Sequence, residues 1–128
     1  MPSASVSSKI DQPVVAVVRD LFFVARIRET GRLASAEVAF ARTPEDLDAA
    51  LGAAPADLAI VDLTMPDADY PALFRTLGAR GAGVPVLGYT THALARQTQP
   101  LHGECTRVVT KEALTRDLGA ILTRGLAA

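Results

Sequence analysis

The sequence predicts a doubly wound α/β domain, in which helices cover both faces of a parallel sheet. Five short apolar runs, typical of buried strands, alternate along residues 13–126 with five segments of helical periodicity. The connections are short, so each strand should return to the sheet through a helix, which makes the strands parallel and the crossovers right-handed. A chain of 128 residues fits one such domain.

The five apolar runs are predicted strands because they are short, bounded by polar or turn-forming residues, and in most cases rich in β-branched side chains. The third, DLAIVD, is the clearest, since it passes abruptly from a buried run to acidic residues. The expected strands cover 13–18, 36–41, 57–62, 84–89 and 106–110.

The helices are predicted from capping residues and from apolar spacing. Asp20, Thr43 and Asp69 stand at expected N-caps, and Pro44 suits the first position of the second helix. Pro100 is expected to end the fourth helix, because proline lacks the N–H that a helix needs. The expected helices begin at residue 21 and cover 43–53, 70–81, 91–99 and 111–126.

Composition narrows the class of protein. The formal net charge is -1, so no basic stripe points to nucleic acid, and no apolar run approaches the roughly 20 residues that span a bilayer. The single Cys105 excludes an internal disulfide and suits a reducing compartment. We therefore expect a cytoplasmic protein with a serine-rich, flexible tail at 1–12 and one domain at 13–128, with no effector domain.

The residues that follow the strands carry the chemistry, because ligands bind at the carboxyl edge of such sheets. Asp62 can act as a nucleophile, and Asp20, Asp62 and the backbone carbonyl of Thr64 offer oxygen ligands for Mg²⁺. The Thr90 hydroxyl and the Lys111 ammonium can hold phosphoryl oxygens. This set predicts phosphoryl chemistry, with a Lys111–Asp62 ion pair in the unmodified protein.

At these residues the chain resembles the response-regulator receiver domains of two-component signalling. VDLTMPDAD is similar to the family's acceptor aspartate with its Met-Pro step, and VPVLGYT is similar to the fourth strand with its switch hydroxyl. The resemblance covers about 13–126 and implies a flavodoxin-like fold with strand order 2-1-3-4-5. It also implies Asp62 as phosphoacceptor, a histidine kinase as phosphate donor, and a partner face on the fourth helix, fifth strand and fifth helix, with a homodimer as a further option.

Several residues depart from the family's pattern. Arg19 stands where receivers carry the first of two acids, and its cation should compete with Mg²⁺ or pair with Asp62. Thr91 replaces a small residue and should narrow access to Asp62. Val108 replaces the aromatic switch residue, and Glu112 replaces a proline.

Three functions remain open at this point. The first is a stand-alone receiver phosphorylated on Asp62, whose only catalysis would be phosphate acceptance and loss. The second is a pseudo-receiver that binds a partner constitutively, without phosphorylation. The third is a flavodoxin-type ligand binder or enzyme, against which the missing glycine-rich loop after the first strand argues.

Overall fold

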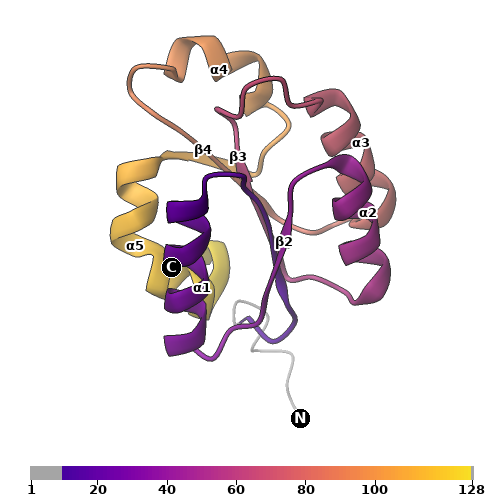
Figure 1. Ribbon diagram of the computed structural model, residues 1–128, viewed down its shortest axis with the longest axis vertical. Helices are drawn as coiled ribbons and strands as arrows, with labels where there is room; N and C mark the ends of the chain where they lie inside the picture. The colour runs from indigo at the N-terminus through magenta and orange to yellow at the C-terminus, as the bar shows by residue number, and fades with distance from the viewer. Residues whose placement is uncertain (1–9, 128) are drawn as a thin grey trace.

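The structure, a computed structural model that describes residues 10–127, contains a five-stranded parallel sheet with helices on both faces (Figure 1). The strand order is β2-β1-β3-β4-β5, as the resemblance implied. The strands are β1 (Val14–Val17), β2 (Val38–Ala41), β3 (Leu58–Asp62), β4 (Val86–Thr90) and β5 (Arg107–Thr110). The helices are α1 (Leu21–Leu33), α2 (Pro44–Ala53), α3 (Tyr70–Arg80), α4 (Ala95–His102) and α5 (Lys111–Arg124), followed by the short 3-10 helix η2 (Gly125–Ala127).

Two apolar layers hold the fold together. Helices α1 and α5 cover one face of the sheet and α2 and α3 cover the other, while α4 lies beyond the carboxyl ends of the strands (Figure 1). Alternate residues of the central strands serve the two layers, so that Leu58 and Ile60 face α1 and α5 whereas Ala59 and Val61 face α2 and α3. Each large aliphatic side chain buried in this way stabilises the fold by roughly 1.5–3 kcal/mol.

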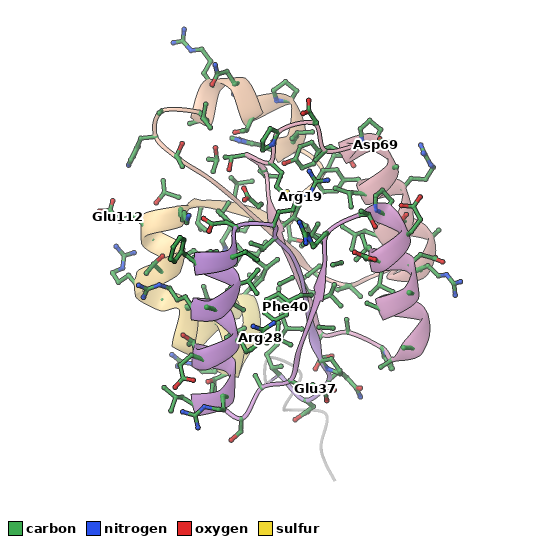
Figure 2. All side chains as sticks on the ribbon, in the orientation of Figure 1. Arg19, Arg28, Glu37, Phe40, Asp69 and Glu112 are labelled. Atoms are coloured by element: carbon green, nitrogen blue, oxygen red, sulfur yellow. The ribbon has the colours of Figure 1, made fainter. Side chains whose placement is uncertain are left out.

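The predicted caps are confirmed. Asp20 accepts hydrogen bonds from the first turn of α1, Thr43 accepts one from Asp46 N, and Asp69 accepts one from Ala72 N. An additional contact ties α1 to the edge strand β2: the Arg28 guanidinium lies 4.9 Å from the centre of the Phe40 ring (Figure 2). These local interactions fix where each helix begins and how α1 is set against the sheet.

Both expected bounds of the fourth helix, 91–99, are wrong, since α4 begins at Ala95. Helix α4 does not end before Pro100 but continues through it to His102. Proline has a helical φ and removes only one backbone donor, so an exposed proline near the end of a helix allows one more turn.

The last residues of the expected tail are held by the domain. The backbone N–H of Ile10 donates to Thr123 O, and the N–H groups of Asp11 and Gln12 donate to Oδ2 of Asp57. The side chain of Ile10 also packs against the α1–α5 layer. Residues 1–9 of the expected tail lie outside the described residues.

Parallel register places the predicted site residues at one edge. Val17 of β1 pairs with Val61 of β3, and Asp62 pairs with Tyr89 of β4. Thr90 pairs in turn with Thr110, which directly precedes α5. The segments that follow β1, β3, β4 and β5 therefore meet at the carboxyl edge. No helix in the described part of the chain is long and apolar enough to cross a membrane.

Glycine 88 in the middle of β4 allows its neighbours to approach closely. A Cβ at this position would lie 2.7 Å from Cys105 Sγ and 2.9 Å from Leu63 Cδ1. We expect Gly88→Ala to lower the free energy of unfolding by about 1–3 kcal/mol through overpacking. Gly78→Ala is the matched control, because nothing lies within 4 Å of a Cβ in α3 there, and it should stabilise by about 0.5–1 kcal/mol. Urea denaturation measures both, and equal effects would contradict the packing argument.

Candidate functional site

Asp62 ends β3 and is the most buried acid of the site, with 7% of its surface exposed. Its Oδ1 accepts two hydrogen bonds from Thr64, one from the backbone N–H at 2.8 Å and one from the hydroxyl at 2.6 Å. Among the described residues, no hydrogen bond reaches Oδ2. One carboxylate oxygen is therefore fixed by the following loop, and the other is left to the pocket.

Tyr70 fixes the same loop from the first turn of α3, and sequence reasoning missed it. Its hydroxyl donates to the backbone carbonyl of Asp62 at 2.7 Å and accepts from Met65 N at 2.9 Å. Burial raises the pKa of Tyr70 to about 12, so the hydroxyl keeps its proton. A tyrosine directly after the acidic loop was the available signal, but only the folded loop shows what it bonds.

Lys111 pairs with Asp20 and not with Asp62, so the predicted Lys111–Asp62 ion pair is wrong. Nζ of Lys111 lies 3.1 Å from Asp20 Oδ2, and each of the two side chains is 39% exposed. Asp20 Oδ1 meanwhile accepts from the backbone N–H groups of Phe22 and Phe23. Each acid has one oxygen bonded by its own segment, and it is the remaining oxygen of Asp20 that lies within reach of the ammonium at the start of α5.

Arg19 binds backbone carbonyls, and the expected pairing with Asp62 is not formed. Its Nε donates to Arg42 O at 3.0 Å, and Nη1 donates to Pro66 O at 3.1 Å. The half-buried side chain thus joins the loop after β2 to the loop after β3, at the centre of the carboxyl edge (Figure 2). We call this bridge the Arg19 clip.

Thr90 is buried, and its hydroxyl is engaged by α4. The hydroxyl of Thr98 donates to Thr90 Oγ1 at 2.9 Å, and Thr98 Oγ1 also lies 2.9 Å from His102 Nε2. This chain of polar groups runs from the site into α4, and no spacing or motif in the sequence predicted it. Thr91 and the exposed His92 line a groove between α1 and α5, where His92 is a surface residue, as expected.

Tyr89 brings an unexpected hydroxyl to the site. The residue is 1% exposed, its ring packs 5.1 Å from that of Phe23, and its hydroxyl has no hydrogen-bond partner in the described structure. Burial raises its pKa, and the negative charge of Asp62 adds to that effect. The site therefore contains a neutral, unused donor beside Asp62.

The residues present do not fit a magnesium ion in this arrangement. Mg²⁺ needs several free oxygen ligands and is opposed by nearby cations. Three of the four carboxylate oxygens of Asp20 and Asp62 already accept hydrogen bonds from this chain, and the Arg19 guanidinium lies at the same edge of the sheet. With Lys111, the four charged groups are formally neutral. No group of three metal-binding side chains occurs among residues 10–127.

Comparison with known proteins identifies the fold. The receiver domain of a sensor histidine kinase from Pseudomonas aeruginosa PAO1 superposes with a TM-score of 0.71 at 20% identity, covering 91% of this chain and 98% of that one. That structure has a magnesium ion coordinated in its active site cleft. The chemotaxis response regulator CheY4 of Vibrio cholerae gives 0.68 at 22% identity, covering 85% of this chain and 97% of that one.

A response regulator from Hahella chejuensis gives a TM-score of 0.72 at 16% identity, covering 88% of this chain and 92% of that one. No family model matches the sequence, and no curated protein matches it. The chain thus has the receiver fold of response regulators, as its resemblance predicted. The identities are low enough that these neighbours establish the fold and leave the function to the site.

The ion pair between Asp20 and Lys111 has a measurable signature. The hydrogen bond from Lys111, helped by the N–H groups of α1, holds the pKa of Asp20 below its ordinary value of 3.8. We expect Lys111→Met to raise the pKa of Asp20 toward that value, as followed by NMR titration of the carboxyl carbon.

The direction of the pH effect on stability follows from this pKa. Because the pKa of Asp20 is lower in the folded than in the unfolded chain, its contribution is complete above the unfolded value and is lost as the pH falls through the folded value. Lys111→Met should weaken this acid dependence, whereas Lys111→Arg should keep it. An unchanged Asp20 pKa in Lys111→Met would show that Lys111 is not its partner in solution.

Proposed function

We propose that this chain is a receiver-type signalling module that acts through protein–protein contacts and does so without phosphorylation of Asp62. The Arg19 clip carries the proposal. A guanidinium stands where receiver domains place an acid, and it is held by carbonyls from the two loops that flank the site.

Charge is the first physical reason. Transfer of a phosphoryl group to an aspartate brings anionic oxygens together, and a divalent cation ordinarily offsets their repulsion. Asp20 and Asp62 are already balanced by Arg19 and Lys111, so a divalent ion would meet a neutral pocket containing two cations. Its binding should be weak, and metal-dependent transfer should be slow.

Preorganisation is the second reason. The loop after β3 is held by Thr64, by Tyr70 and by the clip, and Lys111 is committed to Asp20. A binding surface next to such a fixed loop needs no modification to become ordered, and a preorganised surface loses little entropy on binding. The buried bond from Thr98 to Thr90 extends this fixed region into α4, on the side of the expected partner face.

The alternative is a receiver that accepts a phosphoryl group on Asp62 from a histidine kinase. It is favoured by Oδ2 of Asp62, which has no hydrogen bond from the described residues, and by Thr90 at the same edge. Lys111 would have to leave Asp20 in order to neutralise the modified Asp62. Incubation with acetyl phosphate and Mg²⁺ decides between the two functions.

We expect incubation with acetyl phosphate and Mg²⁺ to leave the intact mass unchanged, where an ordinary receiver gains one phosphoryl group. Arg19→Asp restores the acid and should gain both Mg²⁺ affinity, measured by calorimetry, and phosphoryl mass. The gain should be about tenfold or more in affinity, because a nearby cation is replaced by a ligand.

Two variants serve as controls for this experiment. Arg19→Met removes the cation and the clip without adding a ligand, and should gain little. Arg19→Asp combined with Asp62→Asn should lose the added mass and so locate it. Stoichiometric labelling of the unaltered protein, abolished by Asp62→Asn, would refute the phosphorylation-independent function.

A further inference from the structure

Helix α1 carries an apolar surface that the fold leaves uncovered. Three large hydrophobic side chains are exposed among the described residues, and all three belong to α1: Leu21 at 72%, Phe22 at 91% and Leu33 at 71%. The expected partner face on α4, β5 and α5 contains none of them. Exposed hydrophobic groups of this size mark interaction surfaces when polar residues accompany them.

Two of these residues form a stripe with two charged residues. Phe22, Arg26, Glu29 and Leu33 are spaced by four, three and four positions, which places them on one side of a helix of 3.6 residues per turn. All four are exposed. We call them the α1 stripe; it reads apolar, basic, acidic, apolar along the helix.

The α1 stripe is complementary to itself when reversed. In an antiparallel pair of α1 helices centred between Ile27 and Arg28, Phe22 of each copy lies opposite Leu33 of the other. Arg26 of each copy then lies opposite Glu29 of the other. The apolar contact and the ion pair therefore each occur twice, as a two-fold axis requires. A parallel pair would instead place like charges together.

We propose that the α1 stripe is the contact surface for a second copy of this chain, which binds as an antiparallel, two-fold symmetric dimer. None of the four residues of the α1 stripe belongs to the acid site, although Lys111 lines the groove beside it, and the proposal requires no particular state of Asp62. It therefore stands or falls separately from the function proposed above.

A groove beside the stripe enlarges the contact. It has a volume of about 880 Å³ and runs between α1 and α5, with Phe22, Arg26 and Glu29 on one wall and Lys111 and Thr115 on the other. Figure 1 shows α1 in front of α5, with no other element over its outer side. Leu33 of a second copy would lie over Phe22 at this groove.

The area that the two copies can bury determines how tightly the dimer is expected to associate. A helix of 13 residues is about 20 Å long, and stable interfaces bury about 800 Å² per partner. Two α1 helices alone bury less than this, so the α5 wall must contribute and the dimer should be reversible. Glu29 already forms an exposed ion pair with Arg32 of its own helix, at 2.6 Å. Exchanging this pair for one with Arg26 of the second copy costs little, because exposed ion pairs contribute little free energy.

Sedimentation velocity over a range of concentrations tests the proposal on the full chain. We expect the 13.4 kDa chain to pass reversibly from monomer to dimer. Arg26→Glu and Glu29→Arg should each weaken association about tenfold or more, since each turns two attractive pairs into two repulsive ones. The double variant should recover association, and so should an equimolar mixture of the two single variants.

Matched variants keep the outcome interpretable. Arg75→Glu makes the same change of charge at an exposed position on α3, across the sheet, and should associate like the unaltered chain. Phe22→Ser should weaken association with helix content unchanged by circular dichroism, because Phe22 is 91% exposed. A chain that stays monomeric at every concentration, or a dimer that Arg26→Glu leaves intact, would overturn the proposal.

Discussion

The burial of β1 and β3 at the centre of the sheet is the constraint on which the rest of the structure depends. Both strands are buried on both faces, so charged residues of these segments can lie only at the strand ends. Parallel register then carries all these ends to the same edge. The site is thus a consequence of the sheet: Arg19, Asp20 and Asp62 meet there because nowhere else along β1 and β3 admits a charge.

A metal-binding pocket presents free oxygen ligands, whereas most carboxylate oxygens at this edge already accept hydrogen bonds. Both oxygens of Asp20 are bonded, by a helix start and a lysine, whereas the loop after β3 bonds only one oxygen of Asp62. The Arg19 clip binds carbonyls, which leaves its positive charge in the pocket without cancelling it against one carboxylate. The four charged groups are formally neutral together, which is the basis of our proposal that the domain acts without a divalent ion and a phosphoryl group.

The two surfaces proposed for contacts differ in chemistry. The carboxyl edge is polar, and a buried threonine pair connects it to α4. The α1 stripe is apolar at its ends and charged in its middle, and it lies on the outer side of the domain. Pairing through the α1 stripe and the α5 wall of the groove leaves α4 and β5 uncovered, and the two proposed contacts share only α5.

The sequence by itself determined the fold and the edge at which the site lies. Alternating apolar runs and helix caps report local preferences and burial, and these are properties of neighbouring residues. Asp62, Thr90 and Lys111 could be placed at one edge because strand ends in a parallel sheet must coincide. The resemblance to receiver domains, and not this geometry, singled out Arg19 as a departure from the family's acidic pair.

Only the tertiary structure decided which charged groups pair and which polar groups bond. The sequence predicted that Lys111 pairs with Asp62, and the structure places its ammonium 3.1 Å from Oδ2 of Asp20 instead. Tyr70, Tyr89 and Thr98 join the site through contacts between separate elements, and such contacts have no signature in spacing. The local sequence pattern determines whether a segment forms a strand or a helix. Which side chains form ion pairs and hydrogen bonds depends on where segments that are distant in the sequence lie in the fold.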